Sequence, residues 1–131
     1  MSDQKLLVLV VDDEAPVRTT LCDKLERAGF ATVQAANGLK ALEVVARRPE
    51  IAVVVMDIIM PEKEGLSTIS QIKERNPGIQ ILAISGGGKG EAQDYLLFAK
   101  ELGADDTMRK PFIGDTFVDC VKRLAAARRV G

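Results

Sequence analysis

The chain contains no histidine, and this absence removes several kinds of enzyme at once. Histidine is the usual general base of serine hydrolases and the commonest zinc ligand in enzymes, so a serine-histidine-aspartate triad and a histidine-based zinc site are excluded. Cysteine is also scarce, with only Cys22 and Cys120, far apart and both within expected helices. We therefore expect buried or half-buried reduced thiols in place of a disulfide framework.

A strong net charge and a long apolar run are missing as well. The 18 basic and 19 acidic residues give a formal net charge of −1, which provides no field to attract nucleic acid or an anionic membrane. No apolar stretch reaches the ~18 residues needed to span a bilayer, and segment 1–5 lacks signal-peptide features. The sequence thus predicts a cytoplasmic protein that binds neither nucleic acid nor membrane directly.

What the sequence does contain is an alternation of short apolar runs with longer stretches of helical periodicity. Aliphatic runs at 6–11, 51–56 and 79–84 are typical of strands covered on both faces, whereas 31–35 and 106–108 are shorter, weaker strands. Helices are expected at about 16–28, between Asn37 and Pro49, around Leu66 to Ile72, at about 91–102, and around Phe117 to Leu124.

This alternation predicts one domain over residues 1–131, with no linker and no output domain. Five βα units joined by right-handed crossovers leave few arrangements of the strands. The simplest is an α/β fold with a five-stranded parallel, doubly wound sheet of the flavodoxin-like order 2-1-3-4-5.

Five polar residues stand where the expected strands end. Asp12 and Asp13 follow the first run, Asp57 and Ser85 follow two others, and Lys110 follows the last. The carboxyl ends of parallel strands meet at one edge, where open α/β sheets bind ligands, so these side chains should converge. Three converging carboxylates repel one another unless a cation neutralises them, and Mg²⁺ prefers such oxygen ligands.

These residue types together suit phosphoryl transfer to a carboxylate. A carboxylate can attack phosphorus and form an aspartyl phosphate. The reaction depends mainly on positioning and on neutralising the phosphoryl oxygens. Asp57 is the candidate acceptor, the acidic pair Asp12 and Asp13 the candidate metal site, Lys110 the partner of one phosphoryl oxygen, and Ser85 Oγ the donor to another.

The same residues resemble a known family in order and spacing over essentially the whole chain. The matching segments are Asp12-Asp13-Glu14, Met56-Asp57-Ile58-Ile59-Met60-Pro61 with Gly65, Ser85, and Lys110-Pro111-Phe112. They resemble the receiver domain of two-component response regulators, in the single-domain form typified by chemotaxis proteins. Each segment alone is a weak signal, but the combination is highly specific.

The resemblance implies a role for each matching residue. Asp57 would be the phospho-acceptor, and Asp57 and Asp13 would be direct Mg²⁺ ligands. Asp12 would act mainly through water, and the Ile59 carbonyl would be a backbone ligand. Ser85 would be the switch hydroxyl and Lys110 the phosphate partner, with a cis bond to the proline that follows it.

The resemblance also implies partners. A histidine kinase or a histidine phosphotransfer protein would donate the phosphoryl group, and a downstream protein would bind the helix 91–102, the strand 106–108 and the last helix. The apolar arc Tyr95-Leu96-Leu97-Phe98-Ala99 fits that surface or ordinary core packing. The chain would modify itself and turn over no independent substrate, so we do not expect an enzyme in the usual sense.

Two departures from the family pattern and two alternatives remain. Thr107 stands where the family usually has a tyrosine or phenylalanine, and three glycines follow Ser85. A phosphorylation-independent binding module on the same fold is one alternative, which Thr107 keeps open. A haloacid-dehalogenase-like phosphatase is the other, but it needs Asp-x-Asp after the first strand, whereas Glu14 stands two residues after Asp12.

Overall fold

The computed structural model describes residues 5–58, 64–86 and 91–128. The strands are β1 (Leu7–Val11), β2 (Ala31–Ala35), β3 (Ile51–Asp57), β4 (Gln80–Ser85) and β5 (Asp106–Arg109). The helices are α1 (Ala15–Arg27), α2 (Gly38–Arg47), α3 (Glu64–Arg75), α4 (Glu91–Leu102) and α5 (Thr116–Ala127). The strands form one parallel sheet in the order β2-β1-β3-β4-β5, which confirms the predicted topology.

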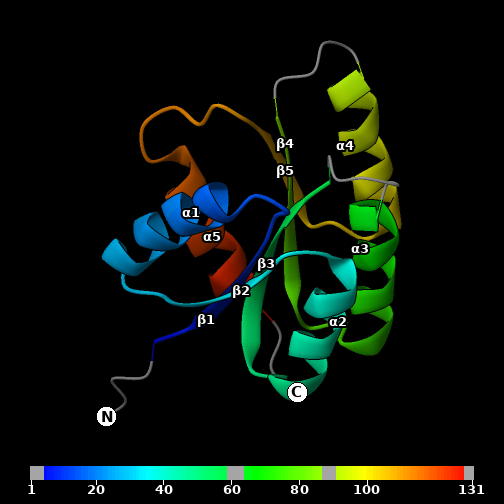
Figure 1. Ribbon diagram of the computed structural model, residues 1–131, viewed down its shortest axis with the longest axis horizontal. Coiled ribbons are helices and arrows are strands. Elements are labelled where there is room, and N and C mark those ends of the chain that lie inside the picture. The colour runs from blue at the N-terminus through cyan, green and yellow to red at the C-terminus, as the bar shows by residue number, and fades with distance from the viewer. Residues whose placement is uncertain (1–4, 59–63, 87–90, 129–131) are drawn as a thin grey trace.

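Helices cover both faces of this sheet, α1 and α5 on one side and α2, α3 and α4 on the other (Figure 1). Successive side chains of strand β1 point to opposite faces of the sheet. Because helices cover both faces, the strand is buried along its whole length. Val8 and Val10 pack with α1 and α5. Leu7, Leu9 and Val11 pack with the other three helices. The uninterrupted aliphatic run therefore reflects burial on two faces, as the sequence predicted.

The pairing of β1 with β3 contains an irregularity that matters for the site. Leu7 pairs with Ile51, but Val8 pairs with Val53, so Ala52 is an extra residue on β3. Such a bulge shifts the register by one position. As a result Val11 pairs with Met56, and the chain leaves the two strands at neighbouring points, at Asp12 and Asp57.

Local signals set the helix ends. Pro16 lies in the first turn of α1, where its missing N–H is not needed. Gly29 follows the helix with φ of 101°, a conformation that glycine adopts without a Cβ clash. The Asn37 side chain caps α2 by accepting a hydrogen bond from the Lys40 N–H at 2.8 Å. Among the described residues, no helix has both the length and the apolar character needed to cross a bilayer.

Both cysteines are free and buried, which confirms the expectation of reduced thiols. Burial raises the pKa of the Cys22 thiol. Burial, together with the neighbouring Asp106 carboxylate, raises the pKa of Cys120 to about 11. Since the thiolate is the reactive form of cysteine, the raised pKa makes each thiol less nucleophilic than an exposed cysteine.

Candidate functional site

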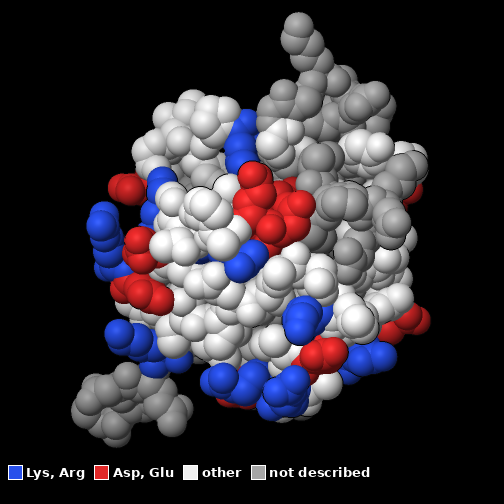
Figure 2. Space-filling view, viewed as in Figure 1, with Lys and Arg blue, Asp and Glu red and all other residues white. Residues whose placement is uncertain are grey.

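The predicted polar residues do converge at the carboxyl edge of the sheet. Asp12, Asp57 and Ser85 are buried, with 0%, 5% and 0% of their surface exposed, while Asp13 is exposed. Acidic side chains form a compact patch on the molecular surface in this region (Figure 2). Buried carboxylates are unusual unless something compensates their charge, so this edge differs from an ordinary solvated loop.

The three acids are close enough to share one cation. One carboxylate oxygen from each of Asp12, Asp13 and Asp57 lies within 4.8 Å of the others. Around one octahedral Mg²⁺, neighbouring oxygens are roughly 3 Å apart and opposite oxygens roughly 4.2 Å apart, because each bond is ~2.1 Å long. A small contraction of the cluster would therefore create a metal site. The chemistry of this all-oxygen donor set fits Mg²⁺.

Lys110 reaches the same cluster from the end of β5. Its Nζ lies 3.4 Å from Asp12 Oδ2 and 3.6 Å from Asp57 Oδ2. Its backbone N–H donates to the Ser85 carbonyl at 2.8 Å, and its bond to Pro111 is cis, as the resemblance implied. The three carboxylates exceed this single ammonium by two charges, which a divalent cation would balance.

Ser85 lies at the site, as predicted, and Thr107 lies on the neighbouring strand β5. Among the described residues, Ser85 Oγ donates one long hydrogen bond, at 3.5 Å, to the Gly86 carbonyl, which holds the hydroxyl weakly. On β5, Thr107 is half-buried and its N–H donates to Asp106 Oδ1 at 2.8 Å. No aromatic ring occupies this position, so the aromatic switch of the family has no counterpart at Thr107.

Asp106 itself is part of a contact set that the sequence did not indicate. Its carboxylate accepts from Cys120 Sγ at 3.4 Å and pairs with Arg123. Burial alone would raise the pKa of Asp106, but the hydrogen bonds from the Thr107 N–H and Cys120 and the Arg123 charge together lower it. The set ties β5 to α5, and no spacing motif links these residues in the sequence.

Arg18 is a second residue that sequence reasoning missed. This half-buried side chain lies in α1. It donates from Nη1 to the Asp12 carbonyl at 2.7 Å and from Nε to Gln34 Oε1 at 2.9 Å. The only signal for it in the sequence is a basic residue early in the helix that follows the acidic pair.

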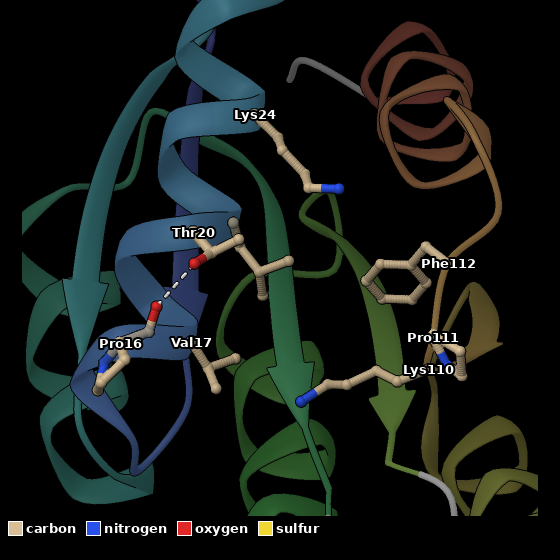
Figure 3. Close-up of a pocket in the computed structure, with 8 residues that line it drawn as sticks. Pro16, Val17, Thr20, Lys24, Lys110, Pro111 and Phe112 are labelled. Atoms are coloured by element: carbon tan, nitrogen blue, oxygen red, sulfur yellow. Dashed lines mark hydrogen bonds between the residues drawn. The ribbon is translucent and has the colours of Figure 1, made fainter.

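An apolar groove runs beside the acidic cluster, between α1 and the segment that joins β5 to α5 (Figure 3). Its volume is about 550 Å³. The Phe112 ring in its wall stacks on Phe117, with centroids 4.9 Å apart and planes 10° apart. Lys110 lies at one end of the groove, beside the carboxylates. The lining residues are Pro16, Val17, Thr20, Leu21, Lys24, Lys110, Pro111 and Phe112.

Some predicted features are only partly visible. Ile59, the predicted backbone ligand, lies outside the described residues, as do Met60, Pro61 and the glycines at 87 and 88. On α4, Ala99 is buried and Tyr95 and Leu96 are half-buried against the core. Leu97 and Phe98 are 61% and 54% exposed, so the apolar arc is both core and surface.

Comparisons with known proteins agree with this geometry. The family profile of the response regulator receiver domain matches residues 8–122. Sporulation initiation phosphotransferase F of Bacillus subtilis is 33% identical over 88% of this chain and 90% of its own length. A putative response regulator NtrX-like of Rickettsia typhi is 35% identical over 91% of this chain, but the match spans only 25% of that protein. The crystal structure of the receiver domain of NtrX from Brucella abortus superposes with a TM-score of 0.82 at 29% identity, covering 91% of this chain and 98% of that one.

Proposed function

Because this chain belongs to the family of response regulator receiver domains, we propose that it accepts a phosphoryl group on Asp57 in a Mg²⁺-dependent reaction. The observation that carries this proposal is the position of the Asp57 carboxylate. It is buried at the end of β3, within 4.8 Å of two further carboxylates and 3.6 Å from the Lys110 ammonium. This is an acceptor surrounded by groups that can neutralise a phosphoryl group.

The proposed step needs few groups. An Asp57 carboxylate oxygen attacks phosphorus while the bond from phosphorus to the donor breaks, and the donor leaves with the electron pair. Lys110 stabilises the charge that develops on one phosphoryl oxygen, and Ser85 Oγ donates to another. Asp13 and Asp57, with Asp12 in support, are the residues that would hold Mg²⁺, which when bound supplies further charge neutralisation.

Metal binding provides a direct test. We expect Mg²⁺ to raise the melting temperature of the unmodified protein, because a ligand that binds only the folded state stabilises it. At ten times the dissociation constant the gain is roughly 1.4 kcal/mol. Asp13→Ala should remove the shift, measured by circular dichroism melting with and without Mg²⁺. Asp23→Ala, which changes an exposed acid on α1, is the matched control. An undiminished shift in Asp13→Ala would place the metal elsewhere.

A protein donor needs a surface next to Asp57, and the groove beside α1 meets this need. It is apolar and open (Figure 3), and Lys110, one of its lining residues, lies 3.6 Å from Asp57 Oδ2. We propose that a histidine kinase or a histidine phosphotransfer protein docks there, so that its phosphohistidine reaches Asp57. Acetyl phosphate, a small donor, requires no such surface.

This difference leads to a paired measurement. Thr20→Tyr places a bulky ring in the groove, and Thr19→Tyr places the same ring on an exposed part of α1 that does not line it. We expect Thr20→Tyr to slow transfer from a protein donor about tenfold, a ~1.4 kcal/mol loss in docking, and to leave labelling by acetyl phosphate unchanged. The kinase that labels the unmodified chain fastest in vitro would serve as donor. Equal slowing by both variants would contradict the assignment of the groove.

The output of the modification is a change in partner binding. We propose that a downstream protein binds the surface formed by α4, β5 and α5, where Leu97 and Phe98 are exposed apolar side chains on α4. The chain spans 25% to 44% of the length of several curated relatives, so the proposal concerns the receiver domain alone. We expect self-phosphorylation and self-dephosphorylation without turnover of another substrate, and a cytoplasmic location remains a prediction.

The phosphorylation-independent binding module is tested by a phosphoryl analogue. Beryllofluoride with Mg²⁺ should bind at Asp57 and stabilise the protein beyond the effect of Mg²⁺ alone. A protein that binds Mg²⁺ but shows no response to beryllofluoride would favour the binding module.

A further inference from the structure

Hydrogen bonds to other parts of the protein hold nearly every polar atom of Asp12. Its N–H donates to the Ala35 carbonyl at 3.2 Å, and its Oδ1 accepts from the Glu14 N–H at 2.9 Å. Its carbonyl accepts from Arg18 Nη1 at 2.7 Å. Its Oδ2 lies 3.4 Å from Lys110 Nζ. These hydrogen bonds therefore fix the Asp12 backbone and carboxylate beside the proposed metal position.

The bond from Arg18 has a further effect, because the Asp12 carbonyl belongs to the peptide plane that joins Asp12 to Asp13. A peptide unit is rigid, so the direction of this carbonyl sets the orientation of the whole plane. Asp13 follows directly, and its exposed side chain makes no hydrogen bond or ion pair with another residue that the structure describes. The angle between the two carboxylates thus depends on the Asp12–Asp13 peptide, and Arg18 holds that peptide.

Gln34 in turn holds Arg18. The guanidinium is a planar fork with several donors in fixed relative positions. With Nη1 on the Asp12 carbonyl and Nε on Gln34 Oε1 at 2.9 Å, the fork cannot rotate without losing one bond. Gln34 lies on β2, which pairs with β1 directly before the acidic loop. The fork therefore connects α1, the loop and the sheet.

We propose that Arg18 is a positioning residue for the divalent cation: it orients the Asp12–Asp13 peptide so that both carboxylates face one ion. The inference rests on the proposed metal site at these acids. Residues that orient metal ligands without touching the metal typically contribute 10- to 100-fold in affinity. We therefore expect Arg18→Met to weaken Mg²⁺ binding about tenfold.

The sign of this effect separates positioning from simple electrostatics. Removing a positive charge next to a cation site should by Coulomb's law strengthen cation binding. Loss of positioning should weaken it. Arg18→Lys keeps the charge and a single donor nitrogen but loses the planar guanidinium, so we expect an intermediate Mg²⁺ affinity. Gln34→Met removes the second anchor alone and should weaken binding less than Arg18→Met does.

The experiment is a titration of each purified variant with Mg²⁺ by isothermal calorimetry, with melting temperatures measured in the absence of metal. Arg27→Met is the matched control, since it removes an exposed arginine from the same helix. A dissociation constant about ten times that of the parent in Arg18→Met, with Arg27→Met unchanged, supports the proposal. An unchanged or lower dissociation constant in Arg18→Met overturns the proposal, even if the melting temperature falls. Arg18 would then stabilise the fold without affecting the metal site.

Three further outcomes distinguish a failure of this inference from a failure of the proposed function. If Arg18→Met does not fold, Arg18→Lys and Gln34→Met carry the comparison, and unchanged Mg²⁺ affinity in both overturns the inference. If Asp13→Ala abolishes Mg²⁺ binding while Arg18→Met retains full affinity, the metal site stands and Arg18 has no part in it. A parent chain that binds no Mg²⁺ would overturn the metal assignment and this inference together.

Discussion

Asp57→Asn is expected to abolish phosphorylation by acetyl phosphate and by a kinase, while the protein stays folded. The substitution removes the nucleophilic oxygen with little change in volume. Asp57 lies at the end of β3 among two other carboxylates, so replacing one charge should not lower the stability of the metal-free protein. Circular dichroism melting would check that the fold is kept.

Mass spectrometry of the intact protein gives the decisive measurement. The parent should gain one phosphoryl mass in the presence of Mg²⁺ and acetyl phosphate, and Asp57→Asn should gain none. Asp23→Asn changes an exposed aspartate of α1 in the same way and should be labelled like the parent. Stoichiometric labelling of Asp57→Asn would show that another residue is the acceptor.

Lys110→Met is expected to slow phosphorylation about 10²-fold at saturating Mg²⁺, the usual cost of removing one group that stabilises developing charge. The Lys110 ammonium lies 3.6 Å from Asp57 Oδ2, where it can reach an oxygen of the incoming phosphoryl group. Methionine preserves the length and apolar stem of the side chain. Initial rates of labelling by acetyl phosphate would be compared at several Mg²⁺ concentrations.

Saturating metal is essential to this comparison. Lys110 is also 3.4 Å from Asp12 Oδ2, so its charge competes with a cation at the same carboxylates. We expect Lys110→Met to bind Mg²⁺ more tightly than the parent although it reacts more slowly. Lys24→Met removes the other ammonium that lines the groove, at the end opposite Lys110, and is the matched control (Figure 3). A parental rate in Lys110→Met would show that the ammonium does not act in transfer.

Much of the fold could be predicted because its signals are local. The run Leu7–Val11 is aliphatic at every position, which only a strand buried on both faces requires. The cap at Asn37 and the proline at the start of α1 marked helix ends by their own backbone preferences. Strand order followed from the number of βα units and the handedness of their crossovers.

The composition of the site was equally accessible, because parallel strands bring their carboxyl ends to one edge whatever the details of packing. Asp12, Asp57 and Ser85 follow or end buried strands, so their convergence needed only the topology. The identity of the acceptor and of the metal ligands also drew on the family resemblance. Ile59 lies outside the described residues, and its role stays a prediction.

The sequence by itself therefore determined which segments form strands and helices, the order of the strands, and which polar residues gather at their ends. Only the tertiary structure decided the bulge at Ala52, which brings Asp12 beside Asp57. It also decided the bonds from Arg18 to the Asp12 carbonyl and to Gln34, and the cluster of Asp106 with Cys120 and Arg123. The reason is physical: backbone preference and periodicity act within a few residues, whereas register and side-chain contacts depend on how distant segments pack.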